Sequence, residues 1–350
     1  MGMTGWWGVQ TELFANAVVQ LANHFFHITI SREIMIVIGG AAMIVTAALG
    51  IRAIGRLSYL AVPLLTAGLI YALISLGRAG NLTSIIHYHP ATSSALSWGA
   101  AAAIVASGFI VGASMNPDYA RFAINKKHAF GYAFTDYAFI YPLLLIASGV
   151  IAISFNTKEI MVHLVPPGYT WLVFVMMMFA TWAANDCNLY SSSLSLAAVL
   201  PKLQRSHLAI LAGVFGIYLA EIHVAEHMVS FLTLLGILIS PISGVFIINA
   251  IGRKHPILFE ELSQIPDWRF AQLIAWFSGA LLGYMTTPKN DLGLGLFKLT
   301  TVPTLDAVIG SACVMLAIKI IENRTMRAPN TVPNALITGR SYASALDESE

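Results

Sequence analysis

Blocks of about 20 apolar residues recur along the whole sequence and restrict what it can fold into. They occupy residues 6–26, 33–51, 57–76, 96–115, 130–153, 171–190, 208–222, 228–251, 270–287 and 302–321. A helix needs about 20 residues to cross roughly 30 Å of hydrocarbon. Backbone polar groups in lipid must be hydrogen-bonded within their own segment, which favours helices. The sequence therefore predicts an all-α integral membrane protein with about ten transmembrane helices.

The composition excludes the common soluble classes. Apolar residues make up 57% of the chain and charged residues only 10%, whereas soluble domains carry about 25% charged residues. Cys187 and Cys313 lie in or beside apolar blocks and predict neither a disulfide framework nor a metal site. The sequence has no glycine-rich phosphate loop, no nucleophile elbow and no basic nucleic-acid footprint. We therefore expect no cofactor, no metal and no nucleic-acid partner, with the lipid bilayer as the surroundings.

The Lys and Arg residues indicate an orientation. If the N-terminus is cytoplasmic, 14 of them fall on the inner side and 5 on the outer side. Because inner loops carry the excess of positive charge, we expect a multi-pass protein of the inner (plasma) membrane with both termini in the cytoplasm. Residues 1–322 are predicted to form the transmembrane domain. Residues 323–350 are polar and are predicted to be a disordered cytoplasmic tail.

Polar groups inside the apolar blocks are expensive in lipid and mark candidate functional sites. Trp6 and Gln10 are four residues apart, so they share one helix face. An indole beside an amide can stack on a flat ring and hydrogen-bond its edge. The alternative is that Trp6 and Trp7 belong to an interfacial aromatic belt. We favour a functional role for Trp6, and both interpretations stay open for Trp7.

A second candidate is the stretch of small residues at 107–114, which includes Gly108 and Phe109. A broken helix there would expose backbone groups that bind a polar ligand. The pattern alone favours close packing of small residues between helices instead. Asp118 and Arg121 follow, three residues apart, and are interpreted as a cytoplasmic structural pair.

The third candidate is the run of polar residues Asn185, Asp186 and Asn188, which follows an apolar stretch. One interpretation is that the helix has simply left the membrane at Asn185. The pattern from Leu189 onward is again small and apolar, so we interpret the polar residues as a binding site at membrane depth.

The fourth candidate comprises Glu221, His223, Glu226 and His227. These residue types could form a metal site or a proton relay, but their spacing matches no known zinc motif. They lie at a predicted external turn, and we interpret them as a solvated turn. An intramembrane enzyme would need such a cluster at membrane depth, and a sensor would need an output domain, so we expect neither.

Four motifs, in this order along the chain, resemble the nucleobase–cation symporter-1 (purine-cytosine permease) family, and within it the cytosine permease branch. They are Gly-Trp-Trp-Gly-Val-Gln at 5–10, Gly-Phe-Ile-Val-Gly-Ala-Ser-Met-Asn-Pro-Asp-Tyr-Ala-Arg-Phe at 108–122, Ala-Asn-Asp-Cys-Asn-Leu-Tyr-Ser-Ser at 184–192 and Ser-Pro-Ile-Ser-Gly-Val at 240–245. The resemblance implies a leucine-transporter-type fold of twelve helices with inverted repeats. It also implies a permease that imports a nucleobase, foremost cytosine, together with H⁺ or Na⁺. Allantoin, hydantoin, uracil and thiamine precursors are the alternative substrates.

The resemblance also assigns substrate-binding residues. Trp6 is similar to the stacking tryptophan of the family's third helix, and Gln10 to its amide partner. Gly108 and Phe109 resemble the unwound point of the sixth helix. Asn185 and Asp186 resemble the pair on the eighth helix that hydrogen-bonds the edge of the ring.

Two departures from the family pattern follow from the same motifs. Ala180 matches the carbonyl of the family's Na⁺ site, but Ala183 and Ala184 stand where two hydroxyl ligands are expected. Because a hard cation depends on oxygen ligands, we expect H⁺ coupling or a weak Na⁺ site, with Asp186 as the titratable candidate.

The second departure is that Met1 directly precedes the segment similar to the third helix. The resemblance therefore predicts a fold without the first two helices and a missing N-terminal segment. A misassigned start, a split gene and a non-transporting fragment of such a permease are the alternatives, and we do not expect transport by this chain alone.

Overall fold

The computed structural model describes residues 2–49, 51–79, 85, 87–88, 97–156, 165, 168–251 and 268–326. Within these ranges the chain is helical and contains no strand. The helices are α1 (Gly2–Phe26), α2 (Arg32–Leu49), α3 (Ile51–Ala79), α5 (Trp98–Ala120), α6 (Lys126–Thr135), η1 (Asp136–Ile140), α7 (Tyr141–Phe155), α8 (Thr170–Val199), α9 (Arg205–Glu221), η3 (Val224–His227), α10 (Met228–Leu238), α11 (Ser240–Ala250), α13 (Phe270–Thr286), η4 (Lys289–Asp291) and α14 (Pro303–Met326). Each of the ten predicted blocks lies on one or more of these helices, which confirms the all-α prediction.

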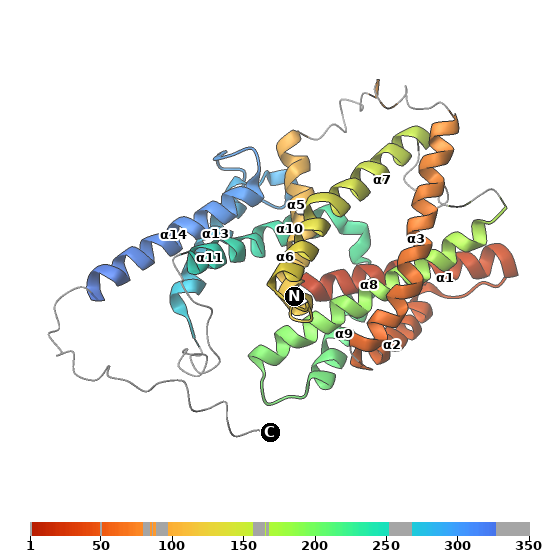
Figure 1. Cartoon of the computed structure of the whole chain (residues 1–350), viewed down its shortest axis with the longest axis horizontal. Coiled ribbons are helices and arrows are strands. Elements are labelled where there is room, and N and C mark those ends of the chain that lie inside the picture. Colours follow the sequence, from red (N-terminus) through yellow and green to blue (C-terminus); the bar gives the residue numbers. More distant parts are fainter. Residues whose placement is uncertain are drawn as a thin grey trace.

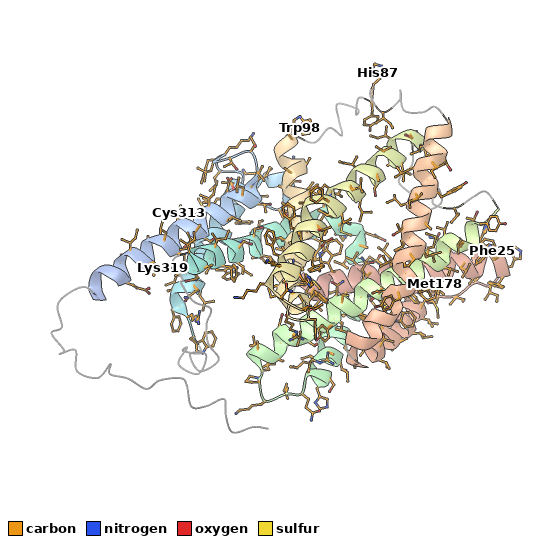
Figure 2. The ribbon with its side chains drawn as sticks, viewed as in Figure 1. Phe25, His87, Trp98, Met178, Cys313 and Lys319 are labelled. Carbon is orange, nitrogen blue, oxygen red and sulfur yellow. The ribbon has the colours of Figure 1, made fainter. Side chains whose placement is uncertain are left out.

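Six of the helical segments are long and apolar enough to cross a membrane by themselves. They are Ser58–Gly77, Trp98–Ala120, Lys126–Phe155, Thr170–Val199, Val224–Ala250 and Pro303–Glu322. Large apolar side chains on these and neighbouring helices point outward, as Phe25 and Trp98 do in Figure 2. Trp98 is 94% exposed. Exposing so large an apolar ring to water would cost free energy, whereas contact with lipid would not.

Two of the predicted blocks contain local irregularities. The block at 130–153 is a single helical rod that changes to π-helical geometry at η1 between α6 and α7. The block at 228–251 is divided into α10 and α11 at Ile239, where Pro241 lies in the first turn of α11. Proline fits a first turn because the amide it lacks would have no partner there.

The predicted boundary before the tail is displaced by a few residues. Helix α14 runs on to Met326, so its last turn extends into the region predicted to be disordered. Residues 327–350 lie outside the described residues.

Helices α1 and α8 pack side by side and form the centre of one part of the molecule, with α2 and α9 against them (Figure 1). Their shared core contains Trp7, Phe14, Met43, Leu189 and Ala212. Helices α11, α13 and α14 pack together in a separate part, connected through α10 and α5.

Trp7 is fully buried, with 0% of its surface exposed. The interfacial-belt interpretation is therefore wrong for this residue. The reason is that α9 approaches α1 through a glycine: a Cβ on Gly216 would lie 2.3 Å from Trp7 Cε3. The absence of a side chain at Gly216 makes room for the indole inside the core.

Candidate functional site: a buried polar pair on helix α8

Helix α8 carries Asn185 and Asp186 through the middle of the protein without a break. Their exposed fractions are 0% and 1%. The helix therefore does not end at Asn185, and both side chains lie inside the protein. Buried polar groups of this kind need hydrogen-bond partners, since desolvation without one is costly.

One side-chain polar atom of each residue in the pair is hydrogen-bonded to a neighbouring helix. The amide Nδ2 of Asn185 donates to Thr11 Oγ1 on α1 at 2.9 Å and to Met43 Sδ on α2 at 3.2 Å. The Asp186 Oδ1 atom accepts from the Thr46 hydroxyl at 2.7 Å, and the Trp182 indole donates to that hydroxyl at 3.0 Å. Side chains from α1 and α2 therefore fix the orientation of both residues.

The other end of each residue has no partner. Asn185 Oδ1 and Asp186 Oδ2 are buried and accept no hydrogen bond in the described part of the chain. A buried unsatisfied acceptor costs about 1–3 kcal/mol. Two such oxygens on neighbouring residues can accept from N–H groups of a ligand, and the carboxylate can also take up a proton.

The structure places Trp6 and Gln10 on α1, both half-buried. The Trp6 indole meets Phe231 of α10 edge-on, with 5.6 Å between ring centroids. The Gln10 side chain makes no hydrogen bond to any residue that the structure describes, so its amide remains able to bind a ligand. The next residue, Thr11, is the one that binds Asn185.

Helix α5 differs from the expectation at Gly108 and Phe109. The helix is continuous from Trp98 to Ala120, so the unwound point implied by the resemblance is not found. Its N-terminus is capped by Ser97, whose Oγ accepts from Ala100 N at 3.2 Å, and Ala, Ile and Val residues continue the helix beyond the cap. Its backbone groups are therefore used within the helix.

Close helix packing at Gly108 is also not found. A Cβ there would meet nothing nearer than Leu232 Cδ2 at 3.8 Å and Tyr141 Oη at 3.9 Å. The Phe109 ring instead stacks on Tyr141, 3.3 Å between centroids, and meets Tyr137 edge-on at 5.3 Å. A Cβ at Gly108 would therefore make ordinary van der Waals contacts, and Tyr141 already covers one face of the Phe109 ring.

A single apolar cluster brings the three candidate helices together. Met3, Val111, Met115, Leu232 and Leu235 form its buried part, and Trp6, Ile110 and Cys187 pack against it. This cluster is therefore bordered by Trp6, by Ile110, which follows Phe109, and by Cys187, which follows Asp186. The structure shows no contact between the rings of Trp6 and Phe109 themselves within its described residues.

The candidate cation position Ala180 lies half-buried on α8, as do Ala183 and Ala184. Their side chains carry no oxygen, so only backbone carbonyls could bind an ion. The weak cation site at Ala180 stays a prediction.

The interpretation of Asp118 and Arg121 as a pair is wrong in this structure. Arg121 donates to the Tyr190 hydroxyl on α8 instead, and no ion pair with Asp118 is found in the described ranges. Arg205 lies 5.1 Å from the Tyr190 ring centroid. Two cations thus share one tyrosine, which connects α5 and α9 to α8.

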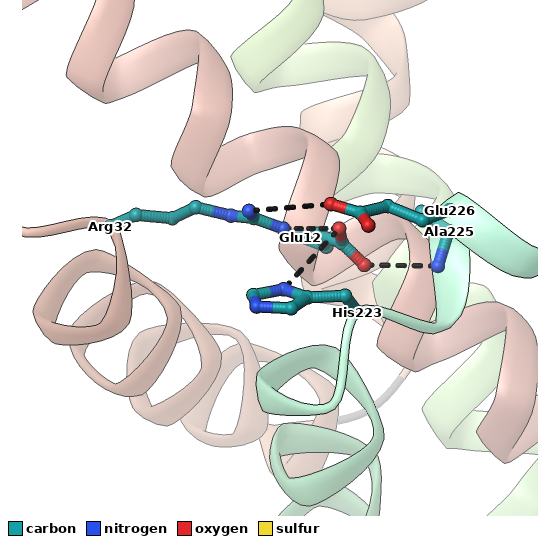
Figure 3. A network of polar contacts seen from close by, with 5 residues as sticks. All are labelled: Glu12, Arg32, His223, Ala225 and Glu226. Atoms are coloured by element: carbon teal, nitrogen blue, oxygen red, sulfur yellow. Dashed lines mark hydrogen bonds and ion pairs between the residues drawn. The ribbon is translucent and has the colours of Figure 1, made fainter.

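Sequence reasoning missed Glu12, which is 1% exposed on α1. Figure 3 shows its carboxylate paired with Arg32, while Ala225 N donates to Oε2 at 3.0 Å. His223 Nδ1 lies 3.9 Å from Glu12 Oε1, and Arg32 lies 3.9 Å from Glu226 (Figure 3). We call Glu12, Arg32, His223, Ala225 and Glu226 the Glu12 clamp. The signal in the sequence was one unpaired acidic residue inside an apolar block.

The Glu12 clamp corrects the interpretation of 221–227 as a merely solvated turn. Glu226 has a side chain 63% exposed, but His223 is only 39% exposed and faces Glu12. The ligand atoms of Glu12, His223 and Glu226 lie within 4.8 Å of one another. Because the Arg32 guanidinium already supplies the positive charge, we interpret the cluster as an ion-paired contact that holds the α9–α10 turn against α1.

Comparisons with known proteins agree with this architecture. A family model described as "Permease for cytosine/purines, uracil, thiamine, allantoin" matches residues 2–288. The cytosine permease of Escherichia coli strain K12 is 24% identical over 328 residues, which cover 93% of this chain and 73% of that protein. The cytosine permease of Escherichia coli O6:H1 strain CFT073 gives the same values.

Two solved structures share the fold. One is Mhp1, a nucleobase-cation-symport-1 family transporter, in a closed conformation with bromovinylhydantoin bound. Its TM-score is 0.73 at 19% identity, and the match covers 92% of this chain and 74% of Mhp1. The inward-facing conformation of Mhp1 gives a TM-score of 0.68, with coverage of 92% and 73%. This chain therefore belongs to the family of permeases for cytosine and purines, uracil, thiamine and allantoin, and it is a multi-pass membrane transporter rather than an enzyme.

Proposed function

We propose that this protein imports a nucleobase, most specifically cytosine, across the inner membrane together with H⁺. Membership of the permease family and the similarity to two cytosine permeases support the substrate class. The observation that carries the proposal is the buried pair Asn185 and Asp186, each with one oxygen that accepts no hydrogen bond from any described residue.

The ring edge would be read by hydrogen bonds. Cytosine presents its amino group, ring nitrogen N3 and carbonyl oxygen along one edge, and Asn185 Oδ1 and Asp186 Oδ2 can accept from the two N–H bonds of the amino group. Gln10 can both donate and accept. A base with the wrong edge would leave these buried groups unpaired, which in hydrogen-bonding sites discriminates by factors as large as about 10⁴.

The ring faces would be held by aromatic side chains. Trp6 on α1 and Ile110 on α5, which follows Phe109, pack against the same apolar cluster. Offset or edge-on aromatic contacts contribute about 0.5–1.5 kcal/mol each beyond burial. The ligand would lie between the helices at mid-membrane, as substrates do in transporters that alternate access around a fixed site.

Proton coupling is supported by the ligands present. The hydroxyl positions of the family's cation site are occupied by Ala183 and Ala184, which weakens a site for a hard cation. Asp186 is a buried carboxylate at the candidate site, and its Oδ2 has no hydrogen-bond partner among the residues that the structure describes. Coupling through it needs only that its proton be taken up on one side and released on the other.

The test is uptake of radiolabelled cytosine into proteoliposomes that contain the purified protein. It decides between this proposal and the expectation from the sequence that this chain alone does not transport. We expect uptake driven by an inward proton gradient without Na⁺, and inhibition by excess unlabelled cytosine. Uptake that collapses when Na⁺ is removed at fixed pH would overturn the proton proposal.

A competition panel separates the other substrates of the family. Stronger inhibition by allantoin, a hydantoin, uracil or a thiamine precursor than by cytosine would reassign the substrate. Cytosine binding without uptake would show that the protein is a non-transporting relative of these permeases.

A further inference from the structure

A cavity lies between α5, α10, η4 and the start of α14. Its volume is about 280 Å³. It begins at the end of α5 that carries Trp98, labelled in Figure 2. None of the substrate-binding residues predicted from the sequence lines it. The charge distribution predicts that this end of α5 lies on the outer side.

The walls of this cavity are fixed by contacts that only glycine permits. A Cβ on Gly99 would lie 1.8 Å from the Thr301 carbonyl oxygen, and one on Gly236 would lie 2.3 Å from Ser107 Oγ. Ser107 also lies 3.2 Å from the Thr304 hydroxyl, close enough for a hydrogen bond between α5 and α14. The cavity is therefore preformed.

The cavity presents polar groups that are not used by the fold. The Thr233 hydroxyl on α10 makes no hydrogen bond within the ranges that the structure describes. Asp291 and Lys298 also line the cavity, and neither takes part in an ion pair with another described residue. A hydroxyl, one acid and one base can serve a ligand that both donates and accepts hydrogen bonds.

Size and charge restrict the ligand. Drug-sized ligands occupy pockets of about 300–1,000 Å³, so 280 Å³ suits a single small ring. Asp291 and the exposed Lys298 supply one charge of each sign, so the lining has no net charge that would favour an ion. The walls therefore favour a neutral, polar ring over an ion, and the hydroxyl groups favour it over an acyl chain.

We propose that this cavity is a second binding site, which takes the same class of small neutral heterocycle as the Asn185–Asp186 site. The choice of ligand in this proposal rests on the proposed function. The ligand would hydrogen-bond Thr233, Asp291 and Lys298 while its faces pack on the apolar parts of α5 and α10. Binding there would precede passage to the buried pair.

The experiment is equilibrium binding of radiolabelled cytosine to the full chain in lipid nanodiscs, with the number of sites per chain as the readout. Ala103→Phe places a ring inside the cavity, and Ala102→Phe, on the exposed side of the same helix, is the matched control. We expect two sites in the wild type and in Ala102→Phe, and one in Ala103→Phe. Thr233→Val should weaken the second site by about 2- to 13-fold, as expected for loss of one neutral hydrogen bond.

Cytosine binding by the Asn185→Ala variant distinguishes failure of the second-site proposal from failure of the proposed function. We expect it to remove the site at the buried pair and to leave the site in the cavity. A single wild-type site that Asn185→Ala removes and Ala103→Phe preserves would overturn the second site while supporting the proposed function. No binding in the wild type would overturn both. If Ala103→Phe lost all binding, unchanged affinities in Thr233→Val would overturn the proposal.

Discussion

The Glu12 clamp leads to a prediction about stability: the double variant Arg32→Met with Glu12→Gln should have a higher free energy of unfolding than Arg32→Met alone. Glu12 is almost fully buried and accepts from Arg32 and from Ala225 N. Arg32→Met removes the cation but leaves the carboxylate in place. Removing one partner of a buried pair costs about 3–5 kcal/mol because the other charge stays uncompensated.

The structure places the expected value at the lower end of that range. The Arg32 side chain is 25% exposed, and Ala225 N still donates to Glu12 in the variant. We therefore expect Arg32→Met to lower the free energy of unfolding by about 3 kcal/mol. Adding Glu12→Gln removes the buried charge and should restore part of this loss, leaving a deficit of about 1 kcal/mol.

The assay is SDS titration of the protein in lipid bicelles, followed by circular dichroism. The matched control is Glu226→Gln, because Glu226 is 63% exposed and lies 3.9 Å from Arg32; we expect a change below about 1 kcal/mol. If Arg32→Met costs less than the control, or if the double variant is no more stable than Arg32→Met, the reasoning about an uncompensated buried charge is refuted.

Three further predictions concern other contacts. Asn185→Ala should destabilise the protein by about 1–3 kcal/mol, since Thr11 loses its buried partner; SDS titration measures this, and an unchanged midpoint would contradict it. Gly216→Ala should lower the free energy of unfolding by about 1–3 kcal/mol because its methyl group would overlap Trp7. The control Gly149→Ala, with nothing within 4 Å of the added carbon, should be neutral or stabilise α7 by up to about 1 kcal/mol. Equal effects of the two variants would refute the packing argument. Tyr190→Phe should cost about 1 kcal/mol through loss of the Arg121 hydrogen bond, and a thermal shift larger than that of Gly216→Ala would contradict it.

The helices could be predicted because lipid imposes a strict rule on every segment. Any block of about 20 apolar residues must satisfy its own backbone, so length and hydropathy locate it. The burial of Asn185 and Asp186 could be predicted for the same reason: polar residues followed by renewed apolar sequence must remain inside. Chain-local patterns are sufficient for both inferences.

The contacts between helices could not be predicted, because they depend on which faces meet. Whether Trp7 faces lipid or core depends on Gly216, more than 200 residues away. Glu12 looked isolated because its partners come from α2 and from the α9–α10 turn. Gly108 could indicate a break or a close contact, and the structure shows neither, since the surrounding residues continue the helix.

The most direct test of the central claim is binding of radiolabelled cytosine to wild-type protein and to Asp186→Ala in nanodiscs at equal folded fraction. Our account predicts saturable binding in the wild type, and loss of the site at the buried pair in the variant while the cavity site is retained. Binding at both sites that is unchanged in Asp186→Ala would contradict the claim that the buried pair on α8 reads the edge of the base.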